Sequence, residues 1–151
     1  MQIGPFKLPA KVNGVIYSDF LAENLPELLE HVSLEERHVM WYQHDGAPSH
    51  YARCTREILN RKYPNRWIGR GGPRAWPARS PDLTPLDFFL WETIKEYVYR
   101  MPINTVQELS DRIDEALATI TPEMIQRSRE NLIRRAQLCI EMGGGHFEHL
   151  L

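Results

Sequence analysis

Apolar positions follow two different periods along the chain, and these periods predict its elements. Near the start, Ile3–Leu8 has the short apolar pattern of a strand, and Asn13-Gly14 has the composition of a turn. A helix is predicted next, with a cap at Ser18 or Asp19 and a kink or restart at Pro26. Its apolar positions recur at near-helical spacing: Phe20, Leu21, Leu25, Leu28 and Leu29.

The strongest strand signal is the apolar and aromatic run Val39–Tyr42. It follows a short helical piece that Ser33 and Glu36 open as a predicted capping box. Glycine and proline end the strand just after Asp45, which places this aspartate at the carboxyl edge of the strand. Ligands of open α/β sheets bind at that edge.

The rest of the chain is mainly helical. A helix is predicted over residues 49–62 and a short strand over residues 66–68, followed by a long loop rich in proline and arginine. Further helices are predicted to open at Pro85, Thr105 and Thr121, and the last stops at the glycines 143–145. This order predicts an α/β sandwich with a helical carboxyl-terminal tail. The apolar positions of the tail are expected to pack on the sheet: Leu109, Ile113, Leu117, Ile120, Met124, Leu132 and Ile133.

Composition narrows the function without deciding it. With 151 residues and 42% hydrophobic content, the chain suffices for one compact domain. Its net charge of -2 argues against general attraction to nucleic acid, so a site for a polyanion must be local. The two cysteines have no metal-ligand spacing, and no apolar run approaches a membrane span. We therefore expect a soluble protein in a reducing compartment, without a membrane partner and without a small-molecule substrate.

Two segments carry the candidate chemistry, His44–His50 and Ser80–Trp91, because each places a carboxylate at the end of a regular element. Asp45 follows the predicted strand, and Asp87 falls in the first turn of a predicted helix. A hard cation such as Mg²⁺ prefers oxygen ligands, and rigidly held carboxylates with substrate phosphate suit phosphoryl transfer. On spacing alone, Asp45 as a turn residue and Asp87 as a helix-start residue remain the simpler interpretation.

The amino-acid sequences of the two segments closely resemble the catalytic core of mariner-like transposases. The similarity continues through Ile3–Phe6 and Arg66–Pro73. The resemblance implies a ribonuclease-H-like fold, DNA as the substrate, Mg²⁺ or Mn²⁺ as the cofactor, and the nucleus as the location. It also implies that Asp45 and Asp87 are the second and third acids of the catalytic metal triad. Asp82 matches an aspartate of the family whose role is architectural.

The chain departs from the family at its amino terminus, where no residue matches the strand that carries the first acid. Asp19 lies at a helix start and is not promoted to the triad. The expectation is therefore an incomplete ribonuclease-H-like domain over residues 1–103, with carboxyl-terminal helices over residues 104–151 packing on the same domain. Activity alone should be low or nil, and the exposed edge near Ile3 predicts self-association, such as a homodimer, partial disorder near the amino terminus, or both.

A basic stretch between Glu57 and Asp82 is the predicted DNA contact, since guanidinium groups bind phosphates and indole rings stack on bases. Its residues are Arg61, Lys62, Arg66, Arg70, Arg74, Arg79, Trp67 and Trp76. The competing interpretation makes the tryptophans buried anchors and the arginines a solvated loop. His44 and His50 are expected to hydrogen-bond near the turn rather than to bind metal. Two rival functions stay open: a catalytically inactive nucleic-acid-binding module and a structural fragment without DNA affinity.

Overall fold

The computed structural model describes residues 3–77 and 80–151. By contacts the chain divides into two compact units. We call Phe6–Arg79 the sheet unit, and Met1–Pro5 with Ser80–Leu151 the helical unit. The division expected after residue 103 follows the family resemblance and stays a prediction.

The predicted strand over Ile3–Leu8 is wrong, because residues 3–9 form no regular element. In the described part of the chain they have no partner strand to hydrogen-bond with. The Phe6 ring lies against the Phe20 ring instead, with centroids 5.1 Å apart. Side-chain packing therefore replaces strand pairing at this end of the sheet unit.

The first helix opens earlier than predicted. Asn13 caps α1 (Gly14–Asp19), since its Oδ1 accepts a hydrogen bond from the Ile16 N–H at 2.9 Å. The helix continues as the π-helical turn η1 (Phe20–Asn24) and restarts as α2 (Leu25–Leu28). Pro26 has no N–H to donate to the Ala22 carbonyl, which explains the predicted break at this point.

The sheet consists of two short parallel strands among the described residues, β1 (Tyr42–Gln43) and β2 (Trp67–Ile68). Tyr42 pairs with Trp67, and α4 (Arg53–Lys62) lies in the connection between the strands. The strand predicted over Val39–Tyr42 is shorter and begins later than expected. Val39 ends α3 (Leu34–Val39), which opens with the predicted Ser33–Glu36 capping box, and its side chain is exposed.

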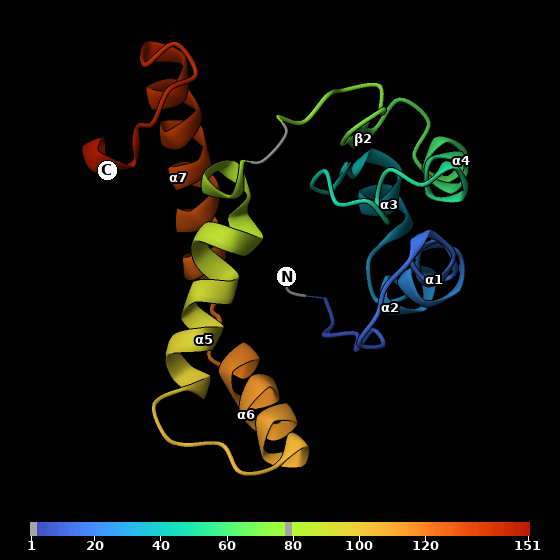
Figure 1. Ribbon diagram of the computed structural model, residues 1–151. Coiled ribbons are helices and arrows are strands. Elements are labelled where there is room, and N and C mark those ends of the chain that lie inside the picture. Colours follow the sequence, from blue (N-terminus) through green and yellow to red (C-terminus); the bar gives the residue numbers. More distant parts are fainter. Residues whose placement is uncertain (1–2, 78–79) are drawn as a thin grey trace. The chain divides into compact units, whose positions relative to one another are not determined.

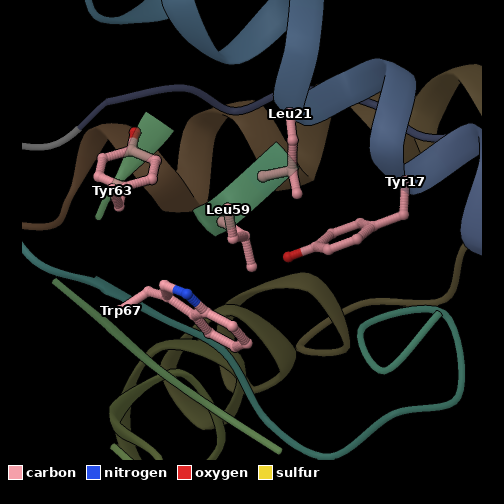
Figure 2. Close-up of a cluster of buried hydrophobic side chains, with 5 residues drawn as sticks. All are labelled: Tyr17, Leu21, Leu59, Tyr63 and Trp67. Carbon is pink, nitrogen blue, oxygen red and sulfur yellow. The ribbon is translucent and has the colours of Figure 1, made fainter. Parts of the chain in front are cut away.

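One hydrophobic cluster joins these elements, and Figure 2 shows its side chains converging between the helices and β2. Trp67 lies at its base with no exposed surface, and its indole Nε1–H donates to Asn60 Oδ1 at 2.9 Å. Burying so large a ring anchors β2 in the unit. The cluster consists of Tyr17, Leu21, Leu59, Tyr63 and Trp67.

The helical unit begins with short turns and then forms longer helices. Its elements are η2 (Pro81–Leu83), η3 (Leu86–Trp91), α5 (Glu92–Val98), α6 (Val106–Ala118), α7 (Pro122–Glu141) and η4 (Glu148–Leu150). Helices α5 and α6 pack side by side (Figure 1) around a core of Ile94, Val98, Ala116 and Leu117. Arg112 closes their connection by donating to the carbonyls of Val98, Met101 and Pro102.

The tail helices begin and end where their capping residues predict, but their apolar faces differ from expectation. Thr105 and Thr121 accept hydrogen bonds from the N–H groups of Glu108 and Met124. Gly143 and Gly144 follow α7 with φ angles of 63° and 83°, a conformation that favours glycine. Ile133, expected to be buried, is 63% exposed, and Leu109 with Ile113 packs against the α5–α6 core. None of the described helices is both long and apolar enough to cross a membrane.

Candidate functional site: two aspartates and a basic loop

Asp45 follows directly on the paired end of β1, as predicted. The His44 N–H still donates to the Ile68 carbonyl at 3.1 Å, so the chain leaves the sheet at the next residue. The Asp45 Oδ1 atom accepts from the Ala47 N–H at 3.0 Å and lies 2.5 Å from His50 Nδ1. Its side chain is 47% exposed, and no hydrogen-bond partner of Oδ2 occurs in residues 3–77 and 80–151. One oxygen is thus held rigidly while the other is available to a ligand.

A cluster of aromatic and imidazole rings surrounds this turn. The His44 and His50 rings stack nearly parallel, with centroids 4.8 Å apart and an interplanar angle of 3°. The Tyr17 hydroxyl lies 2.7 Å from the Tyr42 hydroxyl and 3.4 Å from His44 Nδ1. Gly69 packs against the other edge of His44, where a Cβ atom would come within 2.3 Å of the imidazole. This close approach requires glycine at position 69.

Burial keeps the His44 and Tyr17 side chains uncharged at neutral pH. It lowers the pKa of His44 to about 4, and the nearby His50 lowers it further in the same direction. Burial also raises the pKa of Tyr17 to about 12, with the Asp45 charge adding to the rise and the Tyr42 hydrogen bond opposing it. At neutral pH a neutral His44 therefore lies beneath the Asp45 carboxylate. Its Nε2 atom is buried and has no hydrogen-bond partner in the described part of the protein.

Asp87 occupies the first turn of η3, as predicted for a helix-start acid. Its N–H donates to the Thr84 carbonyl at 2.8 Å, and the Thr84 hydroxyl donates to the Ser80 carbonyl at 3.0 Å. The backbone carbonyl of Asp82 accepts a hydrogen bond from Arg135 Nη1 at 3.0 Å, and the architectural role of its side chain stays a prediction. Asp87 is exposed and belongs to the helical unit, whereas Asp45 belongs to the sheet unit. A metal ion shared by both carboxylates therefore stays a prediction.

The donor atoms suit a hard divalent cation at Asp45, since an exposed carboxylate oxygen beside a fixed turn leaves room for water ligands. Within residues 3–77 and 80–151, no three His, Cys, Asp or Glu side chains gather closely enough to hold a metal ion. The described residues thus offer single carboxylates rather than an all-protein cage.

The predicted basic contacts divide into structural and available cations. Lys62 Nζ donates to the Ala22 carbonyl at 2.7 Å, which replaces the hydrogen bond that Pro26 cannot make. Arg66 donates to the Met40 carbonyl at 3.0 Å. Arg61, Arg70 and Arg74 are exposed and remain candidates for DNA contact, while Arg79 lies outside the described residues.

The two tryptophans also differ from the predicted stacking surface. Trp67 is fully buried in the hydrophobic cluster, so its assignment as a base-stacking residue is wrong. Trp76 is half-buried, and its Nε1 atom has no hydrogen-bond partner among the described residues. Burial of an indole ring was the competing interpretation of this loop, and it holds for Trp67.

Sequence reasoning missed Tyr51 and Arg56. The Arg56 and Arg70 guanidinium carbons lie 4.8 Å and 4.1 Å from the centroid of the Tyr51 ring. Arg56 lies in α4, outside the acid-free stretch that defined the basic loop. Only the crossover between β1 and β2 brings it to Arg70, so no spacing in the sequence signals this cluster.

Comparison with known proteins identifies the relatives of the chain. No protein-family profile matches it. The mariner Mos1 transposase of Drosophila mauritiana is 28% identical over 114 residues, which is 76% of this chain and 31% of that protein. The Tc3 transposase of Caenorhabditis elegans is 29% identical over 119 residues, 78% of this chain and 33% of that protein. The chain is a homologue of the mariner/Tc1 transposases.

The solved structures similar to this chain include the Mos1 catalytic domain. The Mos1 catalytic domain with raltegravir and Mn superposes with a TM-score of 0.78 at 27% identity, covering 93% of this chain and 68% of that one. The Mos1 paired-end complex with Mn gives a TM-score of 0.77 at 28% identity, covering 91% of this chain and 38% of that one. The chain thus has part of the ribonuclease-H-like fold of that domain. The chain spans about a third of the length of the curated relatives it matches.

Proposed function

We propose that this chain supplies part of a metal-dependent DNA cleavage and strand-transfer site, in which Asp45 and Asp87 each contribute one carboxylate. The observation that carries the proposal is the geometry of Asp45, which follows a paired strand with Oδ1 held and Oδ2 open. The homology to mariner/Tc1 transposases supports it, and so do the Mos1 structures with Mn and Mg.

The residues of this chain have separate tasks in that site. Asp45 Oδ2 and the Asp87 carboxylate would hold Mg²⁺ or Mn²⁺, which when bound stabilises the charge on the attacking and leaving oxygens of phosphoryl transfer. The Ala47 N–H and His50 fix the Asp45 carboxylate, and His50 is itself held by its stack on His44. The exposed arginines of the basic loop would bind the negatively charged DNA backbone.

Metal binding is tested on the whole chain by titrating Mn²⁺ and following its free concentration by electron paramagnetic resonance. Asp45→Asn and Asp87→Asn should each weaken Mn²⁺ binding at least tenfold, because an amide oxygen carries no charge. Glu130→Gln, an exposed acid of α7, serves as the matched control and should bind as the parent chain does. Unchanged binding in both aspartate variants would contradict the proposal.

The role of His50 is tested with two variants that separate its ring from its hydrogen bond. His50→Phe keeps a ring to stack on His44 and Tyr17 but cannot donate to Asp45, whereas His50→Asn keeps a donor. We expect His50→Phe to weaken Mn²⁺ binding several-fold and His50→Asn to restore part of it. The reverse order would show that only the ring matters.

The second candidate is a catalytically inactive DNA-binding module. It is favoured by the single carboxylates, because no three metal-ligating side chains gather among the described residues. DNA binding that depends on salt and survives Asp45→Ala with Asp87→Ala, in a chain that binds no Mn²⁺, would select this function over the first.

We also propose a nuclear location, drawn from the family, and self-association, which the sequence predicted separately. Chromosomal DNA as substrate implies the nucleus, and a fluorescent fusion spread evenly through the cell would contradict it. A paired-end complex is known for the Mos1 relative. Sedimentation that detects only monomers at every concentration, with and without DNA, would contradict self-association.

A further inference from the structure

Two arginines from separate segments meet on one tyrosine ring in the sheet unit. Arg56 comes from α4, and Arg70 comes from the loop that follows β2. Their guanidinium carbons lie 4.8 Å and 4.1 Å from the Tyr51 ring centroid, so they are no farther apart than the sum of those distances. We call Tyr51, Arg56 and Arg70 the arginine–tyrosine cluster.

The fold fixes this cluster through its backbone. The Tyr51 N–H donates to the Ala47 carbonyl at 3.2 Å, and Arg56 Nε donates to the Tyr51 carbonyl at 3.2 Å. Beyond Arg70, Gly71 has a φ of 76°, and a Cβ atom there would lie 3.0 Å from Tyr51 Cε2 and 3.1 Å from Arg56 Cδ. The positive φ favours glycine, and the close approach leaves little room for a side chain, so the loop lies directly against the ring.

The charges of the cluster are not balanced by acids. On the same helix, Arg53 pairs with Glu57 at 2.8 Å. In residues 3–77 and 80–151, by contrast, no carboxylate pairs with Arg56 or Arg70, and the terminal nitrogens of both lack an acceptor. The ring face offsets only part of the repulsion between two cations. An anion bound to their terminal nitrogens would offset the repulsion and occupy the donors.

We propose that the arginine–tyrosine cluster binds the phosphate backbone of the DNA strand that approaches Asp45. The inference rests on the proposed function, which identifies the polyanion as DNA. The fold determines where on the chain that polyanion binds. The turn of residues 47–51 carries Tyr51, and His50 in the same turn contacts Asp45, so the cluster and that carboxylate belong to one short segment. The ligand chemistry is the phosphodiester, which guanidinium groups bind through paired N–H donors.

The test is fluorescence anisotropy of a labelled DNA duplex with the whole chain, over a KCl series in EDTA so that no metal takes part. Arg56→Gln with Arg70→Gln should weaken binding about tenfold or more at low salt. The slope of log affinity against log salt should fall by about one for each phosphate that the variant no longer binds. Arg53→Gln is the matched control and should bind like the parent chain, because its charge is already paired on the same helix.

Further variants separate the outcomes. Arg70→Gln alone alters an exposed residue and should lower both affinity and slope without unfolding the chain, as checked by circular dichroism. Tyr51→Phe keeps the ring and should bind normally, whereas Tyr51→Ala should not. Equal affinity and slope in Arg56→Gln/Arg70→Gln and Arg53→Gln would overturn the proposal, as would absence of DNA binding by the parent chain. If inorganic phosphate binds the parent chain but not Arg56→Gln/Arg70→Gln, and both bind DNA equally, the cluster is a site for free anions. The proposal also fails in that case.

Failure here and failure of the proposed function are distinguishable. Mn²⁺ binding depends on Asp45 and Asp87, and the binding assay in EDTA does not involve it. If Mn²⁺ binding depends on both aspartates but DNA affinity does not change in Arg56→Gln/Arg70→Gln, the proposed metal site stands. The proposed role of the arginine–tyrosine cluster then fails.

Discussion

The two units place their candidate acids in different surroundings. Around Asp45, the side chains of the site are also side chains of the core, since Tyr17 belongs to the buried cluster and hydrogen-bonds toward Tyr42 and His44. Around Asp87, the acid lies on the exposed first turn of η3, and the buried cluster of the helical unit begins further along at Ile94. Function and stability should therefore be coupled at Asp45 and separable at Asp87.

The largest effect is expected from Trp67→Ala in the sheet unit. Removing a fully buried indole should lower the free energy of unfolding by about 3–5 kcal/mol, since a cavity replaces it. The variant should also move the imidazole signals of His44, whose ring lies edge-on to Trp67 at 5.6 Å. Urea denaturation and histidine NMR would measure both.

A matched change in the helical unit sharpens this result. Val98→Ala should cost roughly 1–3 kcal/mol and leave the histidine signals of the sheet unit unmoved, because Val98 packs in the α5–α6 core. If the histidine signals shift as strongly as in Trp67→Ala, core and site are no more closely coupled in one unit than in the other.

Acid should weaken the sheet unit through His44. Its pKa of about 4 in the folded chain lies below the ordinary 6.5, so the fold favours the neutral ring. This contribution to stability is fully present above pH 6.5 and is lost as the pH falls toward 4, by up to about 3 kcal/mol. Denaturation between pH 7 and pH 4 should show a smaller loss for His44→Gln, and equal losses would contradict the assignment.

The two acids should differ in their cost to stability. Asp45→Asn should lower the free energy of unfolding by about 1–2 kcal/mol, because it weakens the charge-assisted bond with His50. At Asp87→Asn, the lost interaction of the carboxylate with the first turn of the helix should contribute about 0.5 kcal/mol. Thermal unfolding without metal compares them, and equal costs would remove the contrast between the units.

The smallest effects separate a cap from an exposed apolar residue on α7. Thr121→Ala should cost about 1 kcal/mol, since its side chain accepts from the Met124 N–H. Ile133→Ala should change stability by less than about 0.5 kcal/mol because the residue is exposed. A large loss at Ile133 would show that another surface covers this face in solution.

Local signals predicted several helix ends correctly, although the first helix opens earlier than its predicted cap. Ser33 with Glu36, Thr105 and Thr121 open their helices as expected, and the glycines after α7 end it, because capping is an interaction within a few residues. Strands were predicted less well. A strand needs a partner elsewhere in the chain, so Ile3–Leu8 formed none and the Val39–Tyr42 strand shrank to β1.

The order of elements from the first helix onward, the position of Asp45 after a strand and the position of Asp87 in a first turn were predictable from the sequence, since short-range patterns and motif similarity determine them. Tertiary structure alone decided the contacts of the basic residues and of Trp67. Lys62 donates to the Ala22 carbonyl, for which Pro26 has no N–H. Trp67 is buried in the core, and Arg56 and Arg70 both contact the Tyr51 ring. Each of these contacts joins residues that the crossover between β1 and β2 or the packing of α4 on η1 brings together, and no local spacing encodes such a meeting.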